Sequence, residues 1–469
     1  METFITSANR GSVSTGPYQI DNSCKFEADN SEKLSRSQTT GTNRKKFTVS
    51  FWVKRTEIGA FQVLAIAEGS GNDISFLDFE SDDFLRFRDT ASASNQCILE
   101  TNRKFRDPSA WYHIVLRVDT TESTADDRTR IYVNGVQETS FSARTNFDQN
   151  DDTFWGYNGG ALTWGNALNE ANYFSGYVAD AYYIDGQSLA PTEFGEFDED
   201  SGIWIPINAS GLSVGNNGYY LDFKDSSNLG NDKSGGTDLS EVNIAAADQA
   251  TDTPTNNFAT LNPLFKYPGS QVISEGATLV TRTSGSGLNK TFYTTQGVTS
   301  GKWYIEAQLS GSHGMIGATT MTSMSSYAPD GTYTGTQSTD IGYYSYNGQY
   351  YIGASGTSWG AGNWNTTSHI MQIAIDMDNR KIYFGINNTY QASGNPAGNS
   401  NGITLPDTSD GYMLAFSYDG SGVWKLNTGG YTTMTISSAA SDANGYGTFE
   451  YAPPSGYYAL CGKNLAEFG

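Results

Sequence analysis

Apolar and polar residues alternate with a period of two over many short segments, which is the pattern of β-strands with one buried face. The segments 47–55 (F-T-V-S-F-W-V-K-R), 111–119 (W-Y-H-I-V-L-R-V-D) and 130–135 (R-I-Y-V-N-G) are rich in β-branched and aromatic residues. Similar strands are expected at 61–67, 73–79, 84–89 and 174–184. No segment keeps a helical period beyond one or two turns. The region that contains these segments, from 47 to 184, is therefore predicted to be all-β.

A second group of strands is predicted in the last two hundred residues. Its members are 278–282, 302–309, 315–318, 341–346, 349–353, 370–376, 381–386, 412–418 and 423–427. Asn347-Gly348 is a strong hairpin turn between two aromatic runs. We therefore expect an all-β protein with two tandem antiparallel β-sandwiches, the first over 1–195 and the second over 266–469.

Residues 196–265 separate the two groups of strands and are rich in Asp, Asn, Gly and Ser. Within them, 252–263 (D-T-P-T-N-N-F-A-T-L-N-P) contains two prolines, which exclude a helix interior or a central strand. We interpret 196–265 as a connector whose end, 252–263, is an ordered, irregular linker that packs on one of the domains.

The charge balance excludes some classes of partner. The chain of 469 residues has 50 acidic and 28 basic residues and a net charge of −22. A nucleic-acid-binding protein usually has a basic stripe, and none is present in this sequence. No run approaches the ~18 apolar residues of a membrane span, and the polar start lacks the apolar core of a secretory signal. Three widely spaced cysteines suggest a reducing compartment. We expect neither nucleic-acid binding nor membrane insertion.

The sequence contains no convincing catalytic constellation. A glycosidase on a jelly-roll sheet needs two carboxylates at a fixed spacing, and the nearest approach to it is Asp78-Phe79-Glu80. These carboxylates are more simply the solvated end of a hairpin. His113, His313 and His369 have no partner at the spacing of a metal site or a catalytic pair, and we interpret them as structural. The protein is predicted not to be an enzyme.

Two family resemblances are carried by these strands. The strands 47–55, 111–119 and 130–135 resemble a laminin-G-like, concanavalin-type jelly roll over about 1–195. The segments 301–306 (G-K-W-Y-I-E), 341–343 and 375–387 (I-D-M-D-N-R-K-I-Y-F-G-I-N) resemble a SPRY domain over about 266–430. Both resemblances imply binding or structural modules more often than enzymes.

The combination resembles a group of tailed-bacteriophage virion proteins, especially those of marine phages. This resemblance rests on the segments 21–37, 47–55, 174–186 (F-S-G-Y-V-A-D-A-Y-Y-I-D-G), 252–258 and 453–465 (P-P-S-G-Y-Y-A-L-C-G-K-N-L). It implies a tail fibre, head fibre or other appendage that is assembled in the host cytoplasm and located in the virion. Other virion subunits are then the expected partners, and a homotrimer is expected by analogy.

Two kinds of binding site are candidates. The laminin-G resemblance implies a calcium site at the rim of the sandwich, for which Asp29, Asp119, Asp151 and Asp152 are candidates. A second set is Asp225, Ser227, Asn228 and Asp232, and the sequence does not choose between the sets. Aromatic loops that stack on sugar rings are the second kind, with Trp359, Trp364, Tyr350 and Tyr351 as candidates. The alternative for each ring is a place in the core or in a subunit interface.

Taken together, the sequence predicts a non-enzymatic virion appendage that presents β-sandwich modules to a host-surface glycan. Display of many copies would raise a weak single-site affinity by ~10²–10⁴-fold. One alternative is a capsid or tail decoration protein that stabilises the particle without host recognition. A second alternative, which we disfavour, is a carbohydrate-active enzyme.

Overall fold

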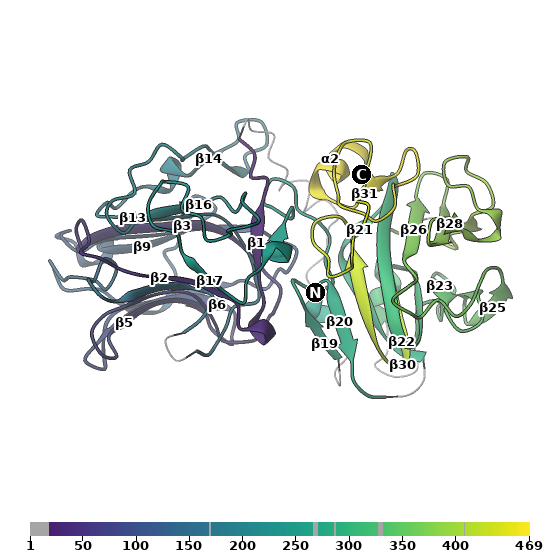
Figure 1. The fold of residues 1–469 in the computed structure, drawn as a ribbon, viewed down its shortest axis with the longest axis horizontal. Helices are drawn as coiled ribbons and strands as arrows, with labels where there is room; N and C mark the ends of the chain where they lie inside the picture. Colours follow the sequence, from purple (N-terminus) through teal and green to yellow (C-terminus); the bar gives the residue numbers. More distant parts are fainter. Residues whose placement is uncertain (1–17, 168–169, 266–270, 286–287, 327–331, 408) are drawn as a thin grey trace. The chain divides into compact units, whose positions relative to one another are not determined.

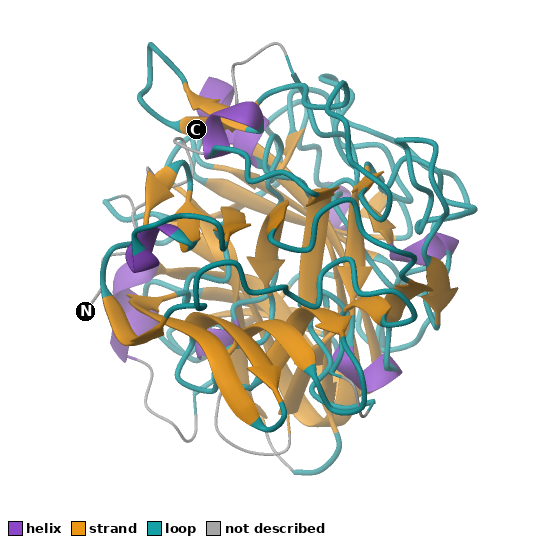
Figure 2. Cartoon of the chain, turned by 90° about the vertical axis from the view of Figure 1, so that its left-hand side faces the viewer, coloured by secondary structure: helices purple, strands orange, loops and turns teal. Residues whose placement is uncertain are grey.

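The computed structural model describes residues 18–167, 170–265, 271–285, 288–326, 332–407 and 409–469. The described residues form two compact units, one ending at Thr255 and the other formed by Asn256–Gly469. We call them the N-terminal sandwich and the C-terminal sandwich. Both consist of strands, nearly all of them paired antiparallel, with only short helices between them (Figure 2). The predicted all-β fold with two tandem sandwiches is confirmed.

Two sheets of eight strands each, with one further pair of strands, form the described part of the N-terminal sandwich (Figure 1). The first sheet has the order β10 (Val136–Gln137), β9 (Thr129–Val133), β8 (Tyr112–Asp119), β3 (Lys46–Arg55), β13 (Gly176–Asp185), β1 (Ser23–Phe26) and β18 (Gln249–Ala250), with β16 (Tyr219–Leu221) on β13. The second sheet has the order β11 (Phe141–Thr145), β7 (Ser94–Lys104), β6 (Phe84–Ala91), β5 (Ile74–Phe79), β4 (Gln62–Glu68), β12 (Ala161–Trp164), β2 (Lys33–Ser37) and β17 (Ser240–Val242).

The core of this sandwich follows from the alternation of side chains along its strands. On β3, Phe47, Val49, Phe51 and Val53 all point into the core, where they meet residues of the second sheet such as Leu77. Because successive side chains of a strand point to opposite faces, the residues between them lie on the outer face of the first sheet. That face is nevertheless buried, since every residue of β3 from Phe47 to Arg55 is buried.

The chain's own segment between Leu189 and Asp252 covers the outer face of the first sheet. Trp204 donates a hydrogen bond from Nε1 to Nδ1 of His113 at 2.9 Å. Lys54 forms a buried ion pair with Asp252 at 2.7 Å between Nζ and Oδ2. Burial lowers the pKa of His113 to about 3, so this ring stays neutral and serves packing. The covering segment therefore closes one outer face of the sandwich.

Most of the predicted connector is thus part of the N-terminal sandwich. Its strands β16, β17 and β18 pair with β13, β2 and β1, and β14 (Gly195–Phe197) pairs with β15 (Trp204–Pro206). The division between the two units falls between Thr255 and Asn256, inside the stretch with two prolines.

A single sheet of thirteen strands forms the described part of the C-terminal sandwich. Its main path has the order β19 (Gln271–Ser274), β20 (Leu279–Arg282), β30 (Tyr412–Asn427), β22 (Lys302–Thr320), β23 (Ile341–Tyr344), β24 (Gln349–Ile352) and β25 (Ser355–Ser358). The branches are β21 (Leu288–Val298), β26 (Met371–Asp376), β27 (Lys381–Ile386), β28 (Thr389–Tyr390), β29 (Ile403–Thr404) and β31 (Tyr458–Ala459).

Two long strands, β22 and β30, organise this sheet. Each joins two segments that the sequence predicts as separate strands, because the glycine-containing stretches between those segments stay paired. The register shifts between Gly311 and His313, and Gly311 lies opposite Gly422. Gly311 has a φ of +102°, and a Cβ there would lie 2.9 Å from the Cα of Gly422. Glycine at both positions permits this close approach.

The helices are short. They are η2 (Ala28–Asn30), η3 (Ala125–Asp127), η4 (Pro191–Glu193), η5 (Ala246–Asp248), η6 (Pro263–Phe265), η7 (Gln391–Ser393), α1 (Met321–Ser326) and α2 (Gly462–Phe468). Among the described residues, none of these helices has the length and apolar character needed to cross a membrane.

Candidate functional site

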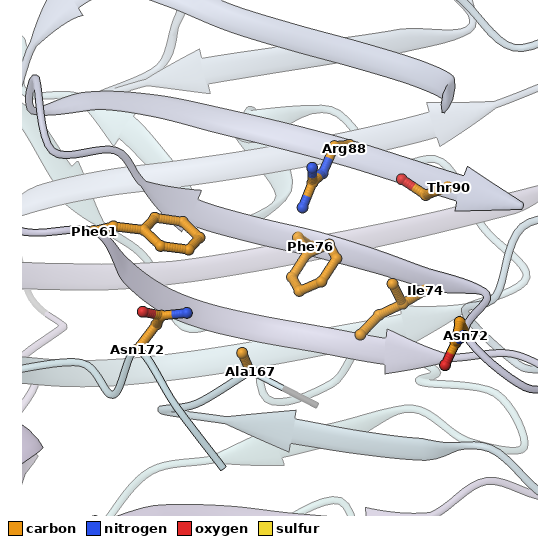
Figure 3. Close-up of a pocket in the computed structure, with 8 residues that line it drawn as sticks. All are labelled: Phe61, Asn72, Ile74, Phe76, Arg88, Thr90, Ala167 and Asn172. Atoms are coloured by element: carbon orange, nitrogen blue, oxygen red, sulfur yellow. The ribbon is translucent and has the colours of Figure 1, made fainter. Parts of the chain in front are cut away.

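A pocket of about 430 Å³ lies on the outer face of the second sheet of the N-terminal sandwich (Figure 3). It is lined by Phe61, Asn72, Ile74, Phe76, Arg88, Thr90, Ala167 and Asn172. Figure 3 shows Phe76 between Arg88 and Ala167, with Phe61 toward one end and Asn72 at the other. The pocket belongs entirely to one compact unit, so its geometry is set within that unit.

The alternation of β5 and β6 places these side chains. On β5, Leu77 and Phe79 point into the core, so Ile74 and Phe76 point outward. The antiparallel register sets Ile74 opposite Thr90 and Phe76 opposite Arg88. Cross-strand pairs of this kind have adjacent Cβ atoms, which brings the ring of Phe76 and the guanidinium of Arg88 together.

The floor of the pocket is a small apolar cluster outside the main core. Val63, Ile66, Ile74 and Ala167 are buried there, and Phe61 and Phe76 pack against them half-buried. The loop after β12 is tied to β4, because the amide of Val63 donates to the carbonyl of Asn172 at 2.8 Å. The side chains of Asn72 and Asn172 are exposed at the rim. The pocket therefore combines an apolar floor, two ring edges and polar groups at its mouth.

The carboxylates on this face pair with only one of its two arginines. Arg86 has three acidic partners: it pairs with Asp78 at 3.2 Å, with Glu80 and, at 3.8 Å, with Glu100. The carboxyl of Asp78 has no exposed surface. Burial raises its pKa to about 7, and the attraction of Arg86 opposes that rise. Asp78 and Glu80 are thus held by a structural arginine and do not line the pocket.

Arg88, in contrast, faces the pocket without a partner of opposite charge. Its guanidinium carbon lies 4.7 Å from the centre of the Phe76 ring. Among the described residues it forms no hydrogen bond and no ion pair, and its buried Nε has no acceptor. Burial and the neighbouring Arg86 lower the pKa of Arg88. An arginine side chain nevertheless stays charged in proteins.

The four aromatic residues predicted to bind sugars are divided between core and surface. Trp364 is fully buried, with its ring centre 5.5 Å from that of Tyr343 and 6.1 Å from that of Trp424. Its ring cannot stack on a ligand without unfolding of this core, so the structure corrects that prediction. The glycine-rich stretch before it, 359–363, is not a strand, as its sequence suggested, and yet it leads this ring into the core.

Trp359 and Tyr350 lie together, and Tyr351 lies apart from them. Both Trp359 and Tyr350 are half-buried against the core, with ring centres 6.4 Å apart. Tyr351 is on the opposite face of β24, where it neighbours Tyr344 at 6.1 Å. Tyr346 extends this second group of rings and is 60% exposed, although the strand pattern suggested a core position. The predicted set therefore does not form one binding surface.

The predicted calcium ligands are not assembled into a site. Asp119 pairs with Lys46 at 2.8 Å and accepts hydrogen bonds from Thr121. Asp152 pairs with Arg44 at 3.7 Å, and Asp151 accepts from the amide of Asp148. Asp29 is exposed on η2. In the part of the chain that the structure describes, no three His, Cys, Asp or Glu side chains are grouped to hold a metal ion.

The alternative calcium set is likewise engaged elsewhere. Asp225 accepts hydrogen bonds from Ser227, and Asp232 accepts from the amide of Tyr220 while lying 3.6 Å from Arg36. These carboxylates organise turns of the covering segment.

Comparison with known proteins finds a family match within the N-terminal sandwich. Residues 26–190 match a laminin G family model described as the Concanavalin A-like lectin/glucanases superfamily. This part of the chain is therefore similar to concanavalin A-like domains, in agreement with the laminin-G resemblance. The comparison with curated proteins found no relative that matches this chain.

Solved structures similar to the chain include three β-sandwich proteins. A carbohydrate-binding protein from Bacteroides ovatus, itself described as putative, shares 16% identity, with 48% of this chain and 59% of that one covered at a TM-score of 0.35. A heptameric SAP-like pentraxin from Limulus polyphemus shares 18% identity, with 36% and 78% covered and a TM-score of 0.28. The SPRY domain of human HERC1 shares 16% identity, with 35% and 96% covered and a TM-score of 0.26.

Proposed function

We propose that the protein is a non-enzymatic carbohydrate-binding protein and that the pocket on β4, β5 and β6 holds a sugar residue. The observation that carries this proposal is the composition of the pocket on an open sheet face. Phe61 and Phe76 offer apolar ring surface, and Asn72, Asn172 and Thr90 offer hydrogen-bonding groups. A sugar ring presents C–H groups on its faces and hydroxyl groups around its edge, so this combination fits both.

The size and position of the pocket support the same conclusion. Its volume of about 430 Å³ lies in the lower part of the ~300–1,000 Å³ range of small-ligand sites, which leaves room for one or two sugar rings. The outer face of the other sheet is closed by the covering segment, whereas this face of β5 and β6 keeps half-buried rings at the surface. Residues 26–190 match a family model whose superfamily includes lectins, which supports the proposal.

Binding without hydrolysis is favoured by the arrangement of the carboxylates. A glycosidase needs two carboxyl groups that reach the sugar from its site. Asp78 is buried without exposed surface, and both Asp78 and Glu80 are held by Arg86. Neither lines the pocket. We therefore assign them to the stability of the sheet.

The variant Phe76→Ala tests the proposed sugar site. Loss of the ring removes the stacking surface, and we expect at least a tenfold weaker affinity in a glycan array followed by titration calorimetry. Phe197→Ala is the matched control, since Phe197 is a half-exposed phenylalanine of the same sandwich outside the pocket. Equal binding by both variants, with unchanged thermal unfolding, contradicts the assignment of the site.

The resemblance to tailed-phage appendage proteins extends the proposal to a place for this binding activity. The protein would act on the virion as a fibre or appendage, as a homotrimer beside other virion subunits, and would attach particles to host-surface glycans. Gold-labelled antibody against residues 266–469 should decorate projecting fibres or the tail tip of the particles. Even labelling of the head would favour a decoration protein, and unlabelled particles would contradict any virion role.

A further inference from the structure

The pocket contains a positive charge that the protein itself leaves uncompensated. The chain has nearly twice as many acidic as basic residues, and several arginines of the N-terminal sandwich pair with a carboxylate. Arg88 does not, as far as the structure describes its surroundings. Arg117 and Arg128 also lack an acidic partner, but they donate hydrogen bonds to neutral oxygens. Arg88 forms neither kind of contact among the described residues, and it lies at the wall of a pocket, where a ligand could supply the missing acceptor.

The carboxylates nearest to Arg88 are already engaged. Asp78, Glu80 and Glu100 act on Arg88 through space, but all three bind Arg86 on the neighbouring position of the same face. Phe76 supports one side of the Arg88 guanidinium, which limits its movement. Its remaining N–H groups are free to donate to a group that enters the pocket.

From this geometry we infer that the pocket is selective for an acidic sugar, one that carries a carboxylate or a sulfate group. The inference rests on the proposed sugar site and specifies its ligand. The ring of such a sugar would contact Phe61 and Phe76, while its anionic group would accept hydrogen bonds from Arg88. A planar guanidinium matches the paired oxygens of a carboxylate or sulfate, which gives both attraction and orientation.

Partial burial of Arg88 strengthens its interaction with an anionic group of the ligand. Arg88 is half-buried, and its Nε is shielded from water without an acceptor, so an arriving anion replaces solvation that is already incomplete. Hydrogen bonds to charged groups in such surroundings correspond to about ten- to a hundredfold in affinity. An acidic sugar should therefore bind at least tenfold more tightly than its neutral counterpart.

The experiment is a calorimetric titration of the full chain with three disaccharides that share a galactose-type ring and differ in their charged group. They are a digalacturonate, a galactose disaccharide with one sulfate, and neutral galactobiose, each measured at low and at physiological salt. We expect the two acidic ligands to bind more tightly than galactobiose, with an advantage that shrinks as salt rises. Which acidic ligand binds better distinguishes a carboxylate-selective from a sulfate-selective site.

Two charge-matched variants assign the effect to Arg88. Arg88→Gln should bring the acidic ligands down to the affinity of galactobiose while leaving galactobiose unchanged. Lys104→Gln removes the same charge from an exposed position of β7 and should leave the preference intact. Equal affinity of acidic and neutral ligands for the native chain would overturn the inference but leave the sugar site standing. Binding of none of the three, together with an empty glycan array, would overturn the sugar site itself.

Discussion

Asp180 gives the sharpest test of how burial controls the stability of the N-terminal sandwich. This residue is only 4% exposed and lies on β13, where the pairing with β3 shifts register between Ala179 and Tyr182. It accepts hydrogen bonds from the hydroxyl of Tyr220 at 2.8 Å and of Tyr18 at 3.2 Å. Burial raises the pKa of Asp180 to about 7, and the two hydroxyl groups only partly oppose that rise.

The sign of the pH effect follows from this raised pKa. The folded protein holds the proton more tightly than the unfolded chain, whose aspartate has its ordinary pKa of 3.8. The stabilising contribution is therefore complete below about pH 4 and is lost as the pH rises through about 7. Between pH 5 and pH 8.5 the free energy of unfolding should fall by roughly 2 to 3 kcal/mol because of this one group.

The variant Asp180→Asn removes the titratable carboxyl group and keeps the shape of the side chain. The amide oxygen can still accept from both tyrosines, and asparagine tolerates the positive φ of 48° at this position. Asp78, Asp89 and Glu32 are also buried with pKa values raised to about 7, so the native protein and the variant both lose stability as pH rises. Only the difference between them isolates Asp180.

The buried cysteines allow this measurement to be made on one unit at a time. Cys24 and Cys97 are buried in the N-terminal sandwich, and Cys461 is buried in the C-terminal sandwich. A brief pulse of a thiol reagent at each urea concentration, read by mass spectrometry of the separate peptides, reports the unfolding of each unit. Labelling of Cys24 reports the free energy of unfolding of the N-terminal sandwich. The difference in this free energy between variant and native protein should increase by roughly 2 to 3 kcal/mol between pH 5 and pH 8.5.

Exposed Asp225 provides the control, since burial contributes little to its carboxyl and the neighbouring Ser227 lowers its pKa. Above pH 5, the free energy of unfolding of Asp225→Asn should change with pH in the same way as that of the native protein. If the free energy of unfolding of Asp180→Asn also changes with pH in the same way as that of the native protein, the argument that burial dominates the ionisation of Asp180 is refuted.

Two further substitutions test the packing of the C-terminal sandwich. Trp364→Ala should lower its free energy of unfolding by about 3 to 5 kcal/mol, because a fully buried ring leaves a cavity beside Tyr343 and Trp424. The measurement is the urea midpoint at Cys461, and an unchanged midpoint would show that the ring is not in the core. Gly311→Ala should cost about 1 to 3 kcal/mol by the same measurement, since its Cβ would meet the backbone of Gly422 at a φ unfavourable to alanine. A tolerated alanine would contradict the close approach of β22 and β30.

The strands of the cores were predictable because their residues alternate with one apolar face. The segments 47–55, 111–119 and 381–386 correspond closely to β3, β8 and β27. By contrast, β7 was missed, because its sequence S-N-Q-C-I-L-E-T-N-R-K is mostly polar and only Cys97 and Leu99 reach the core. A strand whose ends extend into solvent has a weak apolar pattern, although it pairs with β6 from Phe84 to Ala91.

The aromatic residues of the C-terminal sandwich show where local composition misleads. Trp364 follows a glycine-rich stretch that has no strand pattern, and yet it is enclosed by Tyr343 and Trp424, which come from distant parts of the chain. Tyr346 follows a regular strand and is exposed. Burial of a ring depends on which strands pair over it, and that pairing joins residues far apart in sequence.

The pocket that we propose as a sugar site was not predictable from the sequence for a related reason. Both faces of β5 are apolar, since Ile74 and Phe76 alternate with Leu77 and Phe79 around Asp78. The outer face of β3 is also buried, although Thr48, Ser50 and Lys54 lie on it, because the chain itself covers it. The pattern of a strand therefore does not say whether its outer face is covered, or by what. In the first sheet the cover is the segment between Leu189 and Asp252. On β5 and β6 that cover is absent in the described residues, and an arginine without an acidic partner stands beside the exposed rings. This difference between the two outer faces distinguishes a face that the protein covers itself from one that a ligand can cover.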